Sequence, residues 1–566
     1  MRFVELRELA PASLREEYPE FHPVILQLLF NRHLKDQTEI EHFLDPEYHH
    51  LHDPYLFRDM DKAVARIYQA VDRKELIAIH GDYDADGVSG SVIIQSVLDS
   101  LGARSIVFLP HRDKDGYGMN ARTVDYLHTQ NATLIITCDC GISNREEVAL
   151  AKNKGIDTII TDHHQMPDVL PDAYAIIHPK VPSETYPFKY LAGGGVAFKL
   201  AQGLLKSKKC SLTEQEKESQ EKWLLDLVAL SSVADMVELV GENRVLVRFG
   251  LVVLEKTRRL GFRKLFEQAR IREQRFTSQT IAFQIAPRIN AAGRMDHANT
   301  AYMLLRANDP AEATRLAVLL ENQNKERQTR TERMYQEARE LLRGMADKKF
   351  NIIYKKEWVA GMTGLLAGKL TKETGKPTFI MGFDGERVVA SGRSPDGYSI
   401  MDAVKAIKHL LLSYGGHTQA CGFRFDEVQL PEVIAQLQDY GAHSVRSERA
   451  TDRNSAEAAI NFKDIDWTFV DQLQHFEPFG QANPEPVFAT ENVAVHEQKR
   501  VGKKLTHLKL SLEQEGITRN AIAFGGASSA PAVGSVGTVL YTVSINEWNG
   551  NRDIQLNVKK FIPYAA

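Results

Sequence analysis

Short apolar runs alternate with segments of helical pattern from about residue 61 onward. Helical segments such as 88–101 separate five apolar runs, which are LIAIH (76–80), SIVFLP (105–110), TLIITCD (133–139), DTIITDHH (157–164) and AYAIIHP (173–179). Strands joined by helices of this length require crossover connections, and crossovers join parallel strands. The pattern therefore predicts an α/β domain with a doubly wound parallel sheet over residues 61–310.

The rest of the chain shows four other patterns. Residues 1–60 contain short helical stretches, and residues 207–220 form a polar segment that we expect to be a loop between helices. Residues 311–346 are highly charged with helical periodicity, which is typical of a helix that connects two domains. A second α/β domain is predicted over 347–450, a linker over 445–458 and a β-barrel over 459–566. In that last segment WNGN (548–551) indicates a hairpin turn.

Composition narrows the class of protein only slightly. The 566 residues carry a formal net charge of −4, which disfavours nucleic-acid binding over the whole surface but allows a local basic channel. Four cysteines in so long a chain do not form a disulfide framework. Neither a long apolar run nor a signal-like N-terminus is present, so we expect a cytoplasmic protein without a membrane span.

Acidic and histidine side chains follow three of the predicted strands. His80, Asp82, Asp84 and Asp86 come at the end of the first strand, Asp139 ends another, and Asp162, His163 and His164 end a third. Asp235 ends a later helix. An acid after one strand is usually a turn or a helix cap. Because ligands bind beyond the carboxyl ends of parallel strands, acids at several successive ends indicate one shared site.

Clustered carboxylates repel one another, and divalent cations supply the missing positive charge. Mixed Asp and His ligands suit Mn²⁺, with Mg²⁺ as an alternative, and enough ligands are present for two ions. Two adjacent metals serve in-line attack on phosphorus. Cys138 and Cys140 flank Asp139, and strand alternation points them to the opposite face, so we interpret them as packing thiols.

The segments GDYDADG, TCDCGIS, DHH (162–164) and SVADMVEL resemble the four signature motifs of the DHH phosphoesterase superfamily. The resemblance implies that Asp139 and His164 are catalytic, with His164 contacting the scissile phosphate and Asp162 orienting a histidine. It implies a metal-ligand set of Asp84, Asp86, Asp139, His163 and Asp235, in which either His80 or Asp82 completes the shell of the first metal.

Five further segments are similar to the RecJ exonucleases within that superfamily. They are LPHRDKDGYG (109–118), PRINAAGRM (287–295), SGRS (391–394), GGHTQACG (415–422) and FEPFGQANPEPVF (476–488). The resemblance implies a nucleic-acid-binding set of Arg112, Arg288, Asn290, Arg294, Ser391, Arg393, Gly415, Gly416 and His417. A structural ion pair is the alternative for each arginine. Val359 departs from the family, which commonly has histidine there.

The same resemblance implies a DHHA1 substrate-binding domain over 347–450 and an OB-fold over 459–566, with Phe524 and Trp548 as candidate stacking residues. The expected function is metal-dependent 5′-to-3′ hydrolysis of single-stranded DNA to mononucleotides in recombination and repair. We expect a monomer that works with single-strand-binding protein and a RecQ-type helicase. The alternatives are a DHH phosphodiesterase acting on short oligonucleotides, cyclic dinucleotides or pyrophosphate, and a non-catalytic DNA-binding scaffold.

Overall fold

The computed structural model describes residues 4–34, 36–112, 114–272, 275–345, 347–444, 454–548 and 551–564. It divides into two compact units. Unit 1 comprises Met1–Leu51, Glu238–Arg248 and Thr451–Ala566, and unit 2 comprises His52–Val237 and Phe249–Ala450. The division into the five sequence segments given above stays a prediction. Within the described ranges, no helix combines the length and the apolar character that crossing a membrane requires.

The first sheet of unit 2 is parallel throughout, as the alternating pattern predicts. Its strand order is β3 (Arg104–Phe108), β2 (Leu76–His80), β4 (Ala132–Cys138), β5 (Asp157–Thr161) and β6 (Ala175–Ile177). In the register, His80 pairs with Thr137, and Cys138 pairs with Thr161. The carboxyl ends of β2, β4 and β5 therefore lie level at one edge of the sheet.

Helices surround this sheet, and α5 packs against both α8 and α10. The helices of this part are α4 (Met60–Asp72), α5 (Ala85–Ser100), α6 (Ala121–Thr129), α7 (Arg145–Asn153), α8 (Gly193–Lys206), α9 (Glu214–Trp223) and α10 (Leu225–Ala234). The prediction of a loop over 207–220 is wrong from residue 214 onward. The exposed helix α9 begins there behind a capping box of Thr213 and Glu216. Its sequence is polar on all faces and therefore lacks the apolar period that signals a helix.

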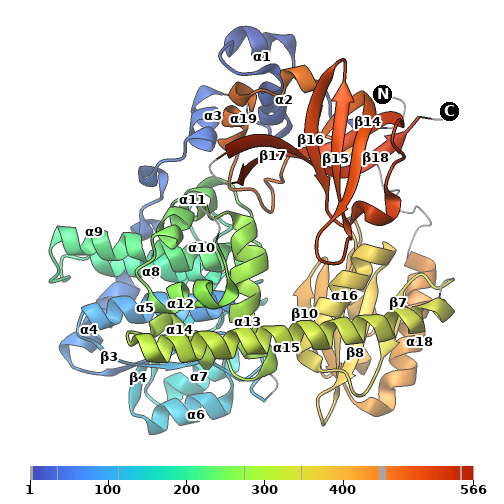
Figure 1. Cartoon of the computed structure of the whole chain (residues 1–566). Coiled ribbons are helices and arrows are strands. Elements are labelled where there is room, and N and C mark those ends of the chain that lie inside the picture. Colours follow the sequence, from blue (N-terminus) through green and yellow to red (C-terminus); the bar gives the residue numbers. More distant parts are fainter. Residues whose placement is uncertain are drawn as a thin grey trace. The chain divides into compact units, whose positions relative to one another are not determined.

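A long helix joins the first sheet to the second, as expected from its charge pattern. α15 (Pro310–Leu342) follows α11 (Gly241–Glu255), α12 (Leu260–Ala269), the π-helix η3 (Thr280–Ile285), α13 (Ala286–Met295) and α14 (Asn299–Arg306). Its first half packs against α12, α13 and α14, where Leu316 and Leu320 are buried. Its second half buries Met334 and Ala338 in a cluster with residues of α16 (Ala360–Thr374). Figure 1 shows these two helices side by side.

The second sheet of unit 2 is mixed. Its order is β10 (Ser413–His417), β11 (Ala420–Phe425), β9 (Val388–Arg393), β8 (Thr378–Phe383) and β7 (Asn351–Tyr354), and only β7 and β8 pair in parallel. Three helices accompany it, which are α16 (Ala360–Thr374), α17 (Ile400–Ala406) and α18 (Leu430–Ser444). Phe379, Phe423 and Phe425 lie in the core of this sheet.

Unit 1 contains a closed five-stranded barrel, as predicted. Around it run β14 (Phe488–Val501), β15 (His507–Gln514), β16 (Ile517–Ala523), β18 (Asn551–Pro563) and β17 (Val536–Trp548), and β17 pairs back to β14. Trp548 pairs with Asn551, which confirms the hairpin, although residues 549–550 lie outside the described residues. The barrel shares one core with α2 (Pro23–Asn31), α3 (Gln37–Leu44) and α19 (Trp467–Gln474).

The predicted linker over 445–458 is only partly within the described structure. Residues 445–453 lie outside it, whereas β12 (Ser455–Ala456) pairs in parallel with β1 (Glu5–Leu6), and β13 (Ala458–Ala459) pairs with β14. The linker prediction is therefore wrong for residues 455–458. Their small and polar side chains lack the apolar alternation that would have indicated strands.

Candidate active site and nucleic-acid interface

The carboxyl ends of β2, β4 and β5 bring the predicted acids together at one edge of the first sheet. Asp139 follows β4 directly and has φ of +63°, a left-handed conformation that is unusual for a residue with a side chain. Such backbone strain is concentrated at functional sites. A Cβ atom at Gly193, at the start of α8, would lie 2.5 Å from Asp139 Oδ1. The glycine therefore allows α8 to approach the carboxylate closely.

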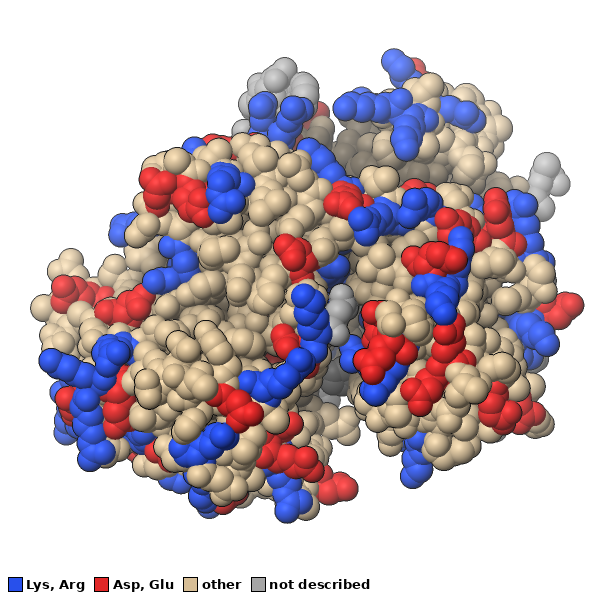
Figure 2. Space-filling view, turned by 90° about the horizontal axis from the view of Figure 1, so that it is seen from below, with Lys and Arg blue, Asp and Glu red and all other residues tan. Residues whose placement is uncertain are grey.

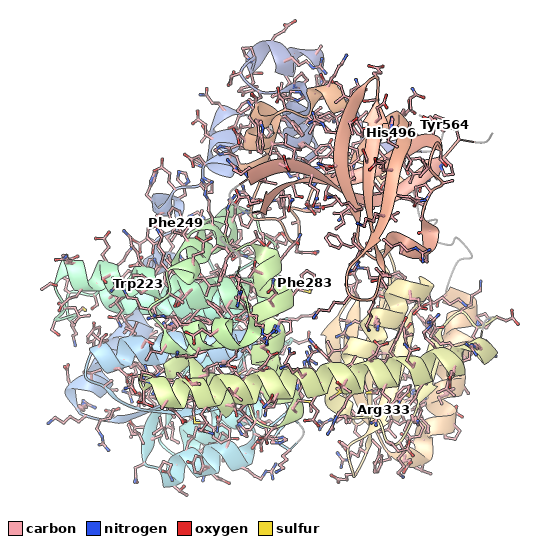
Figure 3. The ribbon with its side chains drawn as sticks, in the orientation of Figure 1. Trp223, Phe249, Phe283, Arg333, His496 and Tyr564 are labelled. Carbon is pink, nitrogen blue, oxygen red and sulfur yellow. The ribbon has the colours of Figure 1, made fainter. Side chains whose placement is uncertain are left out.

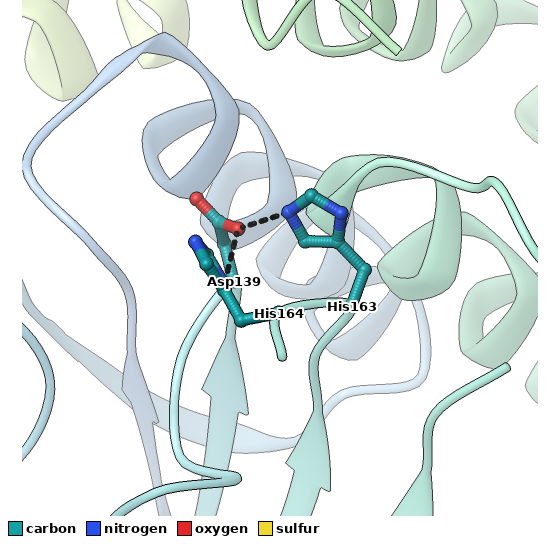
Figure 4. A group of neighbouring side chains, drawn as sticks. All are labelled: Asp139, His163 and His164. Carbon is teal, nitrogen blue, oxygen red and sulfur yellow. Dashed lines mark ion pairs between the residues drawn. The ribbon is translucent and has the colours of Figure 1, made fainter. Parts of the chain in front are cut away.

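Three overlapping groups of side chains could each hold a cation. They are Asp82 with Asp84 and Asp139, Asp86 with His163 and Asp235, and Asp139 with His163 and His164, and the ligand atoms of each group lie within 4.8 Å of one another. His163 Nε2 is 3.2 Å from Asp139 Oδ1 and 3.5 Å from Asp235 Oδ2. Figure 4 shows Asp139 between the two histidines. Asp139 is thus shared between neighbouring groups.

The electrostatics of this cluster fit divalent cations. The pKa of Asp82 is raised well above its usual value, mainly by burial and then by the charge of Asp84. The pKa of Asp139 is raised in the same way, by burial and then by the charge of Asp86. Burial lowers the pKa of His163 to about 4, so the ring stays neutral, as a ligand must be. Asp82 Oδ1, Asp139 Oδ1 and His163 Nε2 are buried without a hydrogen-bond partner. A cation would satisfy these atoms and offset the repulsion.

Asp86 is held in place by three groups that were not predicted from the sequence. Its carboxylate accepts hydrogen bonds from the backbone N–H groups of Gly193 (2.8 Å) and Gly194 (2.7 Å) and from Ser231 Oγ (2.5 Å). Asp84 caps α5 by accepting from the N–H groups of Asp86 and Gly87. Three consecutive glycines at 193–195 allow another segment to approach the backbone closely. This run could have indicated the hydrogen bonds from Gly193 and Gly194 to Asp86.

His164 is oriented by two neighbours. Its Nδ1 lies 2.8 Å from Asp162 Oδ1 and 2.9 Å from the hydroxyl of Tyr117. Burial alone would lower the pKa of His164, but the hydrogen bond and charge of Asp162 outweigh it and raise that pKa to about 9. Tyr117, which also donates to the Asp139 carbonyl oxygen at 3.2 Å, was missed by the sequence analysis although it lies in a segment quoted there.

His80 and Asp82 occupy different surroundings. Asp82 belongs to a cation group, whereas among the described residues His80 belongs to none. His80 is fully buried, with Nδ1 3.6 Å from Cys140 Sγ and its ring 5.3 Å from that of Phe108, and burial lowers its pKa to about 4. Cys138 and Cys140 are buried free thiols outside these groups of described residues.

Arginines from distant segments of unit 2 gather at the start of α16. Arg294 Nη1 donates to the Gly361 carbonyl oxygen at 2.9 Å, and the Arg112 side chain lies against Gly361 and stacks on the Tyr83 ring at 4.0 Å. A Cβ atom at Gly364 would lie 3.1 Å from Arg393 Nη2. Burial, followed by the charges of Arg112 and of Arg327 on α15, lowers the pKa of Arg294 to about 9. Arg327 was not predicted from the sequence.

The other predicted nucleic-acid contacts differ in their surroundings. Arg288 Nε forms an ion pair with Glu321 at 2.7 Å, and Asn290 Oδ1 accepts from the Ala85 N–H at 2.8 Å. Ser391 Oγ lies 2.9 Å from Thr363 Oγ1 beside the arginines. The remaining three, Gly415, Gly416 and His417, lie on β10, and the side chain of His417 is outside the described part of the chain.

Charge on the face drawn in Figure 2 is mixed rather than uniformly basic. In Figure 2, Lys and Arg side chains are interspersed with Asp and Glu over the face shown. On the barrel, Phe524 is exposed and its ring contacts that of His507, whereas the side chain of Trp548 lies outside the described residues. Binding of an anionic polymer to unit 2 would therefore depend on local clusters such as the arginines at α16.

Comparison with known proteins first defines the class. Residues 76–231 match the DHH family N-terminal domain, residues 347–442 the DHHA1 domain and residues 456–560 the RecJ OB domain. This order of domains is the fold expected from the sequence, with a parallel-sheet DHH domain, a DHHA1 domain and a C-terminal barrel.

Two curated relatives and a solved structure then define the family. The chain is 34% identical to the single-stranded-DNA-specific exonuclease RecJ of Bacillus subtilis, covering 95% of this chain and 67% of that protein. It is 30% identical to the RecJ exonuclease of Haemophilus influenzae, covering 96% of each. Thermus thermophilus RecJ, solved in complex with Mn²⁺, superimposes with a TM-score of 0.83 at 28% identity, covering 100% of this chain and 80% of that one. The chain therefore belongs to the RecJ family.

Proposed function

We propose that the chain is a metal-dependent exonuclease that hydrolyses single-stranded DNA from the 5′ end to mononucleotides, in recombination and repair. The observation that carries this proposal is the pairing, within unit 2, of a buried carboxylate–histidine cluster with a cluster of arginines. The names of the relatives support the substrate, since B. subtilis and H. influenzae RecJ are both called single-stranded-DNA-specific exonucleases.

We assign two divalent ions to the first cluster, Mn²⁺ most readily and Mg²⁺ as the alternative. Asp82, Asp84 and Asp139 would hold one ion, and Asp86, His163 and Asp235 would hold the other together with Asp139. When bound, such ions supply an activated water and neutralise charge that develops on the phosphate. Structures of T. thermophilus RecJ with Mn²⁺ and with Mg²⁺ support this assignment.

The side chains of the protein have separate tasks in this reaction. Asp162 and Tyr117 orient His164, which donates a hydrogen bond to a non-bridging oxygen of the scissile phosphate. Arg112, Ser391 and Arg393 bind the 5′-phosphate, because guanidinium groups fork onto phosphate oxygens and a hydroxyl can donate to them. Arg294 lies beside them and adds positive charge. The end of the strand is thus fixed while the first phosphodiester bond lies at the carboxylates.

Incubation with Mn²⁺ and four substrates tests the proposal. These are a 5′-labelled single strand, the same strand as a duplex, a dinucleotide and pyrophosphate, with Asp139→Ala as the control protein. We expect mononucleotides from the single strand, little product from the duplex and none from the variant. Turnover of pyrophosphate alone would instead indicate a small-substrate phosphodiesterase, and binding without turnover a non-catalytic scaffold.

The setting of the reaction is also a proposal. We infer that the protein is a cytoplasmic monomer and that single-strand-binding protein and a RecQ-type helicase supply its substrate, as the resemblance to RecJ exonucleases implies. A pull-down with each purified partner, combined with size-exclusion chromatography, tests these inferences.

A further inference from the structure

Two large apolar side chains are exposed, one next to a residue of the metal cluster and one on a segment that packs against the helix ending at that residue. Met236 directly follows Asp235 and is 72% exposed, with φ of +59°. The Met236 N–H donates to the Val233 carbonyl oxygen and the Val237 N–H to that of Ser232, which closes α10 in the geometry where glycine is usual. A methionine here strains the backbone without filling any core. Its side chain therefore requires another explanation.

Phe283 is the second such side chain and is 76% exposed. It lies in the π-helix η3, whose flanking residues Ile281 and Ile285 are fully buried. The core contacts of this segment are thus made without Phe283, and π-helical turns are frequent at functional sites. Figure 3 labels Phe283 and shows the segment from which it projects.

Both residues are fixed relative to the metal cluster. η3 packs against α10, the helix that ends at Asp235, and continues directly into α13. α13 is held against the chain that carries the first aspartates, because Asn290 accepts from the Ala85 N–H and a Cβ atom at Gly293 would lie 2.4 Å from the Tyr83 carbonyl oxygen. Met236 therefore lies next to a residue of the cluster, and Phe283 lies on a segment fixed between α10 and α13, both of which adjoin the site.

We propose that Phe283 and Met236 form an apolar platform on which bases of the DNA strand stack beside the metal cluster. This inference rests on the proposed function and adds a determinant of specificity to it. Every base offers a flat face, so stacking on an aromatic ring is independent of sequence. In a duplex each base already stacks on and pairs with its neighbours. The platform therefore binds only a strand whose bases are unpaired.

Substitution of Phe283 tests the platform by steady-state kinetics on substrates of increasing length. For Phe283→Ala we expect KM for a 20-nucleotide single strand to rise about tenfold, because the stacking energy of one base on an aromatic ring is lost. The rise should be much smaller for a dinucleotide. Phe283→Trp should restore the KM, whereas Phe283→Leu, which keeps the apolar character without the flat face, should not. Quenching of 2-aminopurine in the strand should fall in parallel with binding.

Met303→Ala is the matched control for Met236→Ala, because Met303 is a half-exposed methionine of unit 2 on α14. The KM of Met303→Ala should equal that of the unmodified protein, whereas Met236→Ala should raise KM a few-fold. An unchanged KM in Phe283→Ala, or equal losses on the dinucleotide and the long strand, would overturn the platform. Failure of the unmodified protein to cut single strands would instead overturn the proposed function itself.

Discussion

Unit 2 contains two clusters of like charge that are built in opposite ways. The carboxylates of Asp82 and Asp139 are buried and that of Asp84 is partly buried, and desolvation with repulsion between neighbouring aspartates raises their pKa values. At the start of α16, burial and neighbouring arginines lower the pKa of Arg294. In each cluster the like charges repel one another, and this repulsion is offset when a ligand of opposite charge binds. The first would hold cations, and the second is the proposed site of the 5′-phosphate.

The two clusters also influence each other. Arg112 lowers the pKa of Asp82 and of Asp84, although burial dominates at both, and Asp84 partly counters the fall of the Arg294 pKa. A phosphate at the arginines would remove part of the positive charge that the carboxylates feel. We therefore expect the metal ions and the 5′-phosphate to bind with some mutual dependence. The following substitutions separate the two clusters.

Asp139→Asn should have the largest effect, because Asp139 is shared by two cation groups. We expect nuclease activity to fall on the order of 10³-fold or more. The metal-free variant should unfold at a higher temperature than the metal-free unmodified protein, since one repelling charge is gone. Addition of Mn²⁺ should then raise its Tm much less. Activity assays and thermal unfolding with and without Mn²⁺ measure these effects.

Asp172→Asn is the control for that substitution, because its carboxylate is exposed and pairs with Lys152. It should leave activity and the Mn²⁺-dependent rise in Tm unchanged. If Mn²⁺ raised the Tm of Asp139→Asn as much as that of the unmodified protein, Asp139 would not be a metal ligand.

Arg393→Ala tests the second cluster, with a smaller expected effect. Loss of a charged hydrogen bond should lower the preference for 5′-phosphorylated over 5′-hydroxyl ends by about ten- to hundredfold. Arg393→Lys should give an intermediate preference, because lysine keeps the charge but not the fork. Rates on the two kinds of end, at saturating Mn²⁺, measure the ratio.

Arg333→Ala is the matched control, since Arg333 is an exposed arginine on α15 (Figure 3). Full retention of the 5′-phosphate preference in Arg393→Ala would remove Arg393 from the proposed phosphate site.

The contrast between the clusters also explains which features could be predicted from the sequence. Asp82, Asp139 and His163 end strands of a parallel sheet, so strand periodicity alone brings them to one edge. Arg112, Arg294 and Arg393 meet only through the packing of α13, α15 and α16, and here the resemblance was needed. Arg327 was missed because it lies in a helical segment whose neighbouring residues are nearly all polar or charged as well. The π-helix at Phe283 has no periodic signature that would distinguish it from an α-helix.

The loop between β3 and α6 connects the two clusters, because it carries Arg112 toward α16 and Tyr117 toward His164. Tyr117→Phe removes the hydroxyl that contacts His164 and Asp139 and leaves the ring in place. We expect kcat to fall a few-fold to about tenfold, which corresponds to the net free energy of one hydrogen bond. The preference for 5′-phosphorylated ends should be kept, since Arg112 is untouched.

Single-turnover rates on 5′-phosphorylated and 5′-hydroxyl strands measure both quantities, and Tyr126→Phe on the exposed side of α6 serves as the control. A loss of 5′-phosphate preference as large as that of Arg393→Ala would contradict the expectation that Tyr117 acts only through His164. It would mean that the loop moves as one body, so that the position of Arg112 depends on the contact between Tyr117 and His164. In that case binding of the strand end would align His164 for the reaction.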